Sequence, residues 1–169
     1  DRYPTYAGLK FHPSGHSYPI TGENYRPALE FAAARGLIVL SHTWGGSAFD
    51  RPELVAQVAE RYPQVVLLAG HSGHGQFAEM MDVARRYPNV YMELTAAYAV
   101  HGVIEAMVEQ VGAHKVVLGY DLPWFDPHYA IGCVVMAHIS EDARRAILRG
   151  NAVRLLRGRI RTFGQDFQD

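Results

Sequence analysis

The segment Val65-Val66-Leu67-Leu68-Ala69-Gly70-His71 decides the predicted fold. Its apolar residues run without alternation, which is typical of a strand buried on both faces of a parallel sheet under helices. Residues 37–42 and 116–121 repeat this pattern, and each of the three runs ends on a residue that can bind a metal or move a proton. In folds of alternating strands and helices the carboxyl ends of such strands carry the chemistry, so we expect a metal-assisted active site there.

Five strands are predicted in all, over residues 7–12, 37–42, 65–71, 90–94 and 116–121. Their starts lie 25 to 30 residues apart, the interval that one strand, one helix and two short loops occupy. The near copies Arg61-Tyr62-Pro63 and Arg86-Tyr87-Pro88 each place a proline where a helix must end before the next strand. The chain is therefore predicted to be a series of βα units.

Apolar stripes and capping residues predict helices between these strands. They are expected over residues 27–36, 50–61, 77–84 and 103–112, in a last helix capped by Ser140, and in a short helix over residues 151–156. No linker or shift in composition divides the chain. We expect one domain over residues 1–157 and a polar C-terminal tail over residues 158–169.

Size and composition limit the class of protein. The chain has 169 residues, 49% of them hydrophobic, which is enough for one domain with a sizeable core. The net charge is −1 and the basic residues are dispersed, so no nucleic-acid partner is expected. The single Cys133 and the lack of an 18-residue apolar stretch favour a cytoplasmic protein with no membrane partner. Because the chain starts at Asp1 without a methionine, we expect it to be the later part of a longer protein.

His42 and His71 are the first candidate site residues. His42 is followed by Gly45 and Gly46, which allow a backbone or a ligand to approach closely, although a histidine there also suits packing. His71 opens the glycine-rich turn Gly70-His71-Ser72-Gly73-His74-Gly75. The alternative of a phosphate-binding loop is disfavoured, because the glycines do not fit the dinucleotide fingerprint and no P-loop lysine follows.

Asp121 follows an apolar strand, and a buried carboxylate without a partner costs several kcal/mol. We therefore expect a metal, a histidine or an arginine beside it, and favour this role over a helix cap. Lys10 and His12 share one side of the first predicted strand. Three roles are open for Lys10: it could orient a substrate carboxylate, bridge two metals as a carbamylated lysine, or only cap the strand. Trp44 and Trp124 are expected to wall a substrate pocket, with core packing as the alternative.

Taken together, these motifs resemble the amidohydrolase-2 family of TIM-barrel metal-dependent hydrolases, which also includes nonoxidative decarboxylases. The matching stretches follow the family order over most of residues 7–157: Gly8-Leu9-Lys10-Phe11-His12-Pro13, Ser41-His42-Thr43-Trp44, Leu68-Ala69-Gly70-His71-Ser72-Gly73, Val90-Tyr91-Met92-Glu93-Leu94, Lys115-Val116-Val117-Leu118-Gly119-Tyr120-Asp121-Leu122-Pro123-Trp124 and Gly150-Asn151-Ala152-Val153-Arg154-Leu155-Leu156.

The resemblance implies an incomplete barrel whose five strands correspond to the fourth through eighth of eight. It implies that His42 is a metal ligand, that His71 acts on substrate or water, and that Asp121 is both a ligand and a proton acceptor. The His-x-His pair of the family's first strand is missing, so only two of the three ligands of a catalytic zinc are present. Five strands cannot close a barrel, and at 25 to 30 residues per unit the absent part amounts to roughly 80 residues. A missing N-terminal segment or a second copy of the chain is expected to complete it.

The implied activity is hydrolysis of an amide or lactone-like bond in a small carboxylated substrate, with zinc or else manganese activating water. Decarboxylation on the same scaffold, which would make the protein a lyase, is one alternative. A catalytically incomplete barrel fragment or assembly module is another, so whether this chain alone is an enzyme stays open. A flavodoxin-like nucleotide binder also has five parallel strands, but the chain lacks a phosphate loop after the first strand.

Overall fold

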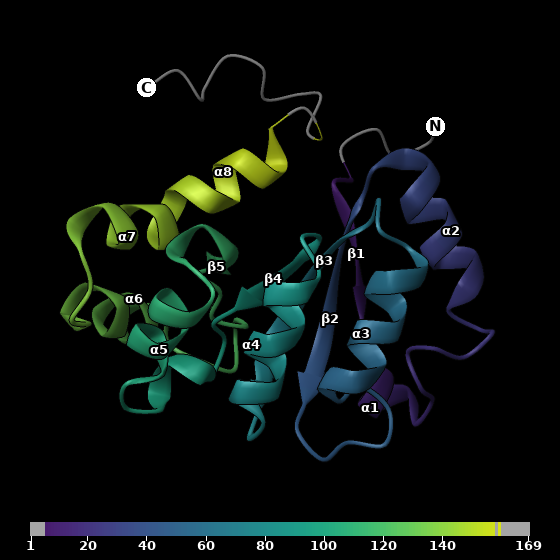
Figure 1. Cartoon of the computed structure of the whole chain (residues 1–169), viewed down its shortest axis with the longest axis horizontal. Helices are drawn as coiled ribbons and strands as arrows, with labels where there is room; N and C mark the ends of the chain where they lie inside the picture. The colour runs from purple at the N-terminus through teal and green to yellow at the C-terminus, as the bar shows by residue number, and fades with distance from the viewer. Residues whose placement is uncertain (1–5, 158, 160–169) are drawn as a thin grey trace.

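A computed structural model describes residues 6–157 and residue 159, and one sheet of five parallel strands lies at its centre (Figure 1). Each strand pairs with the next along the chain: β1 (Gly8–Phe11), β2 (Ile38–Trp44), β3 (Val66–His74), β4 (Val90–Glu93) and β5 (Val116–Val117). Because all five run in the same direction, their carboxyl ends meet at one edge of the sheet. The predicted α/β fold with five parallel strands is confirmed.

Helical segments connect the strands and follow the last one. The α-helices are α1 (Pro13–His16), α2 (Arg26–Arg35), α3 (Pro52–Arg61), α4 (Phe77–Arg86), α5 (Val103–Gln110), α6 (Pro127–Met136), α7 (Glu141–Arg145) and α8 (Asn151–Leu156). Short 3-10 turns form η1 (Ala97–Ala99) and η2 (Ala113–Lys115), and a π-helical turn, η3 (Ala146–Gly150), joins α7 to α8.

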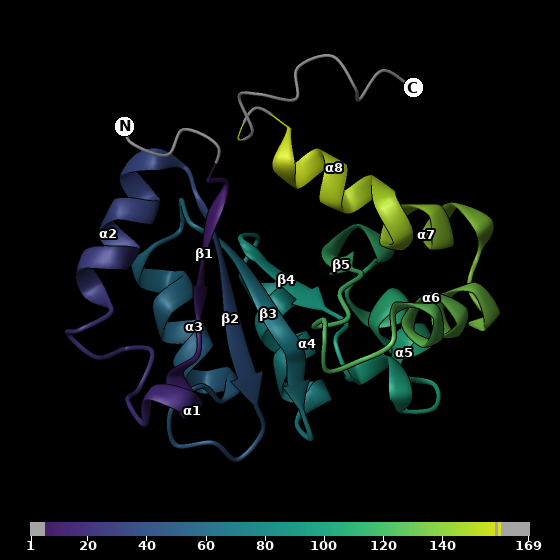
Figure 2. The same cartoon turned by 180° about the vertical axis from the view of Figure 1, so that it is seen from behind.

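The main core lies between one face of the sheet and the helices. Figures 1 and 2 show α2, α3 and α4 along the same face of β1, β2 and β3. The most deeply buried residues of this layer are at most 2% exposed, and they include Val39, Leu67 and Met92 from the strands and Leu29, Val55, Met80 and Met107 from the helices. Such burial contributes about 1.5–3 kcal/mol for each large side chain, so this layer holds the strand ends in place.

A second, smaller apolar cluster covers the opposite face of the sheet. Ile38 and Val117 are buried there under Leu155 of α8. Figure 2 shows α8 near the ends of the strands opposite to their arrowheads. Strand register places Lys10, Leu40, Leu68 and Tyr91 in one row across the sheet. α8 therefore covers this face around Ile38, at the start of β2, and Val117 of β5.

The two Tyr-Pro repeats end helices as predicted. α3 ends at Arg61 and α4 at Arg86, and each arginine lies over the ring of the tyrosine that follows it, Tyr62 and Tyr87. The Asn89 side chain donates to the backbone oxygens of Ala59, Tyr62 and Val65, which ties the two repeats together.

Two predictions need correction, and one helix was missed. The fifth strand is not residues 116–121 but only Val116–Val117, because the Leu118 N–H donates to the Ile147 oxygen of η3 and leaves the sheet. α6 was not predicted, since its sequence is apolar on nearly every side and shows no stripe. The last two helices are not separate, because η3 continues one into the other.

No helix among residues 6–157 is long and apolar enough to cross a membrane. The C-terminal tail predicted for residues 158–169 lies outside the described residues, except for residue 159.

Candidate active site

A hydrogen-bonded pair formed by His42 on β2 and Asp50, in the loop before α3, lies at the carboxyl ends of the strands. His42 Nδ1 is 2.7 Å from Asp50 Oδ2, and the Asp50 side chain is fully buried. Ser14 donates to the same oxygen from its hydroxyl, at 2.8 Å, and from its backbone N–H, at 3.3 Å. Because a carboxylate only accepts hydrogen bonds, His42 Nδ1 carries the proton and Nε2 keeps a free lone pair.

The charge of Asp50 follows from these contacts. Burial alone would raise the pKa of Asp50, but hydrogen bonds from His42, Ser47 and Ser14 outweigh burial and leave that pKa below its ordinary value. Asp50 Oδ1 is buried and has no hydrogen-bond partner among the described residues. Asp50 is therefore an anion at neutral pH, and an anion behind an imidazole fixes the ring and increases its basicity toward a metal.

Aromatic rings surround His42. The His12 ring stacks on His42 with centroids 4.3 Å apart, and the Trp44 ring is parallel to His42 within 10° at 5.9 Å. Trp44 also stacks on His74 at 4.4 Å. His12 Nδ1 accepts a hydrogen bond from the Gly15 N–H, so it is unprotonated. The structure thus brings the predicted residues His12 and Trp44 next to the predicted ligand His42.

His71 lies near the end of β3, and its ring makes an edge-to-face contact with the His42 ring at a centroid distance of 4.8 Å. Its backbone is in the left-handed region, with φ of 66°, and its Nδ1 is 3.2 Å from the Thr95 carbonyl oxygen. Burial, followed by the electrostatic influence of the neighbouring His42, lowers the pKa of His71 to about 4. His71 is therefore neutral at pH 7, and its Nε2 can accept a proton or a hydrogen bond.

The carboxylate of Glu93 lies beneath His71. One oxygen accepts from the His71 N–H at 3.3 Å, and the other accepts from the Thr95 N–H at 3.1 Å and hydroxyl at 2.6 Å. Burial raises the pKa of Glu93 above its ordinary value, against the lowering effect of these bonds. Gly119 makes room for it, because a Cβ on that residue would lie only 1.6 Å from Glu93 Oε1.

Lys10, on edge strand β1, and Asp121, after edge strand β5, both influence the charge of His71. The charge of Lys10 lowers the pKa values of His12 and His71, while that of Asp121 raises the pKa of His71. Asp121 is exposed, with φ of 55°, in a turn that follows β5. The prediction that Asp121 is buried at a strand end is therefore wrong, since the strand stops four residues earlier.

Trp124 lies in that same turn and its side chain is 81% exposed. The structure does not pack it against the histidines, so its predicted contact with substrate stays a prediction. Trp44 is half-exposed beside them, in keeping with a wall of an open pocket.

The metal ligands predicted from the sequence are only partly assembled. Among residues 6–157 and 159 no three histidine, cysteine, aspartate or glutamate side chains lie close enough together to hold a metal ion. His42 has the geometry of a ligand, with its far nitrogen anchored by a carboxylate, but a catalytic zinc needs three protein ligands. The described residues therefore fit one side of a metal site and do not complete it.

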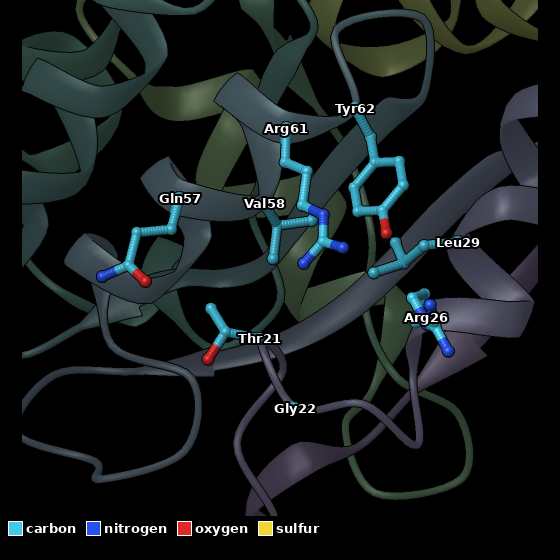
Figure 3. A pocket seen from close by; sticks show the side chains of 8 residues that line it. All are labelled: Thr21, Gly22, Arg26, Leu29, Gln57, Val58, Arg61 and Tyr62. Atoms are coloured by element: carbon cyan, nitrogen blue, oxygen red, sulfur yellow. The ribbon is translucent and has the colours of Figure 1, made fainter.

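The structure has one hollow near the end of β1 and another between helices α2 and α3. One of about 490 Å³ adjoins the end of β1 and is lined by Phe11, His16, Tyr18, Asn24, Tyr25 and Ala28. The other, of about 140 Å³, lies between α2 and α3, and Figure 3 shows the Arg61 side chain extending into it. Neither hollow is lined by His42, His71 or Asp121, so neither adds to the ligand set.

The sequence analysis missed the roles of Asp50 and Ser14. Asp50 was assigned only to the start of a helix, although it follows His42 by eight residues in one strand-to-helix loop. An acidic residue in such a loop, just before the helix-opening Pro52, is the signal that could have identified a partner for His42. Ser14 gave no comparable signal, because its contact depends on how α1 folds back on that loop.

Three solved structures show the same fold. An uncharacterised TIM-barrel protein from Bordetella bronchiseptica is 24% identical, with a TM-score of 0.72 over 82% of this chain and 52% of its own. The 5-carboxyvanillate decarboxylase of Sphingomonas paucimobilis is 17% identical, with a TM-score of 0.69 over 89% and 58%. A Pseudomonas putida protein described as a 2-pyrone-4,6-dicarboxylic acid hydrolase is 22% identical, with a TM-score of 0.68 over 88% and 62%.

This chain therefore spans only half to two thirds of the length of these proteins, and its five-stranded sheet is part of a TIM barrel. No curated protein matches it. A family model described as amidohydrolase matches residues 3–158, almost the whole chain, and confirms the resemblance seen in the motifs. The chain belongs to the amidohydrolase-2 family of metal-dependent enzymes.

Proposed function

We propose that this chain supplies one side of the active site of a metal-dependent hydrolase, which cleaves an amide or lactone-like bond in a small carboxylated substrate. The observation that carries the proposal is the pair of His42 and the fully buried Asp50, joined at 2.7 Å. A buried carboxylate that anchors one imidazole nitrogen and leaves the other free is the usual support of a metal-binding histidine.

The ligands from this chain would be His42 Nε2 and the Asp121 carboxylate, with the remaining ligands supplied from outside the described residues. Zinc, or else manganese, would lower the pKa of bound water and polarise the substrate carbonyl. Asp121 is exposed at the rim, where it can accept a proton from water and pass it on. His71 is neutral at pH 7, and it would hydrogen-bond the substrate or share in the proton transfer.

The preference for a carboxylated substrate comes from the charges around the histidines. Lys10 lies close enough to lower the pKa values of both His12 and His71, and its ammonium is exposed. A substrate carboxylate would pair with it. The rings of His12, His42 and Trp44 are stacked on one another, and an outer ring face of this stack would give a planar substrate a flat surface to pack on.

That flat surface also favours a second candidate, nonoxidative decarboxylation of an aromatic acid, in which a proton donor near the rings protonates the carbon. Incubation with 2-pyrone-4,6-dicarboxylate and with 5-carboxyvanillate, followed by ¹³C NMR, separates the two. Ring opening without loss of carbon dioxide supports the hydrolase, and release of carbon dioxide supports the lyase. A chain that does neither, and whose histidines bind no metal, would contradict both candidates and favour a catalytically incomplete barrel fragment or assembly module.

Zinc binding to the 169-residue chain tests the proposal. Because the described residues supply only part of the ligand set, we expect weak zinc binding in equilibrium dialysis, and we expect His42→Ala to abolish it. The matched control is His128→Ala, which removes a histidine paired with Asp126 at 2.9 Å but with a side chain that is 92% exposed. Zinc binding that survives His42→Ala, or that falls equally with His128→Ala, would contradict the proposal.

A further inference from the structure

We infer that Glu93 is a positioning residue, which fixes the His71 imidazole in one tautomer and one orientation. His71 Nδ1 is then protonated and faces Thr95, while Nε2 is unprotonated and faces away from it. The value of this for catalysis rests on the proposed function, because it assumes that His71 acts on substrate or water. The geometry itself does not depend on that function.

First, Glu93 accepts hydrogen bonds from both His71 and Thr95, the two residues that are themselves joined through His71 Nδ1. Glu93 Oε2 accepts from the His71 backbone N–H, and Glu93 Oε1 accepts from the Thr95 backbone N–H and hydroxyl. His71 Nδ1 in turn lies 3.2 Å from the Thr95 carbonyl oxygen. The three residues form a closed ring of hydrogen bonds, in which Glu93 sets the distance between His71 and Thr95.

The second step is the direction of the bond between the ring and Thr95. A carbonyl oxygen can only accept a hydrogen bond, so His71 Nδ1 must donate. The tautomer of a neutral histidine is decided by the partner of one nitrogen, and the other nitrogen is then available for proton transfer. A shift of the Thr95 carbonyl would release this constraint.

The third step is that the site is shaped for a carboxylate. All three contacts to Glu93 come from donors, so an amide in its place would turn its NH₂ group toward at least one of them. Glu93 is buried, and the segment after β5 leaves space for it at Gly119, where a Cβ would meet Oε1 at 1.6 Å. His71 also needs such a hold, because its backbone is in the left-handed region, which non-glycine residues rarely occupy.

The test is long-range ¹H–¹⁵N NMR of the ¹⁵N-labelled, metal-free chain at pH 7, with His71→Gln used to assign the His71 signals. In the wild type we expect one protonated nitrogen, Nδ1, and one unprotonated nitrogen, Nε2. In Glu93→Gln we expect the single tautomer to be lost, so that both nitrogen shifts move toward their average. The matched control is Glu105→Gln, which removes another carboxylate that accepts a backbone N–H, from His138 at 2.8 Å, and it should leave the pattern unchanged.

Unchanged His71 shifts in a folded Glu93→Gln variant would overturn the inference. If that variant does not fold, Thr95→Val serves instead, because it removes one donor to Glu93 and keeps the Thr95 carbonyl. We expect a smaller move in the same direction, and no move would again overturn the inference. Since no metal or substrate is present, failure of zinc binding would count against the proposed function alone.

Discussion

Replacement of Asp50 by alanine tests how strongly the strand ends depend on one buried carboxylate. Asp50→Ala removes the acceptor of the hydrogen bonds from His42 Nδ1, the Ser14 hydroxyl and the Ser14 N–H, among others. An unpaired buried donor costs about 1–3 kcal/mol. His42 and Ser14 are only partly buried and can turn to water, so the low end applies to each. We expect the free energy of unfolding to fall by about 2–4 kcal/mol.

Urea unfolding followed by circular dichroism at pH 7 measures this change. The control is Asp82→Ala, which removes an exposed carboxylate paired with Arg85 and should cost less than about 1 kcal/mol. The m-value should stay constant, since the same surface is exposed on unfolding. A loss for Asp50→Ala no larger than that for Asp82→Ala would refute the reasoning.

The effect of Asp50→Ala on the free energy of unfolding should depend on pH. Because the pKa of Asp50 in the folded chain lies below its ordinary value, its stabilising effect is complete above about pH 4 and is lost as the pH falls through the folded pKa. The difference in stability between wild type and Asp50→Ala should therefore shrink in acid. A difference that stays constant down to acid unfolding would contradict an ionised Asp50.

Three further predictions concern the neighbouring residues. The pKa of His71 is about 4 in the folded chain and about 6.5 unfolded, so stability should rise between pH 4 and 6.5 by at most about 3 kcal/mol, and His71→Gln should flatten this rise in urea unfolding. Gly119→Ala should displace Glu93 and lower the free energy of unfolding by about 1–3 kcal/mol. The control is Gly132→Ala, which has open space at its Cβ and should cause no such loss of stability. Met107→Ala should cost about 2–5 kcal/mol by thermal unfolding, because Met107 is fully buried, and a smaller loss would show that α5 is not part of the core.

Most of the sheet could be predicted from the sequence. Continuous apolar runs and the Tyr-Pro breaks are local signals, and they gave β1 to β4 within a few residues. The predicted length of the fifth strand was wrong because it depends on a contact between residues far apart in the sequence. Residues 116–121 are as apolar as a strand, but Leu118 pairs with Ile147 of η3, which lies almost thirty residues further along the chain.

The site could be predicted in part, for a similar reason. His42 and His71 were found because strand ends mark them directly. Their partners Asp50 and Thr95 lie on other elements, and the contacts depend on loop conformations that spacing does not determine. Asp121 was identified as a candidate, but it was predicted to be buried and is exposed, because the strand before it is shorter than predicted.

The most direct test of the account is a zinc titration of the ¹⁵N-labelled chain in which all histidines are observed in one spectrum. The account predicts that His42 Nε2 changes first, while its Nδ1 stays protonated against Asp50. The exposed pair of His128 and Asp126 serves as the internal comparison. If His128 responds first and His42 does not move, the strand ends of this chain are not one side of a metal site.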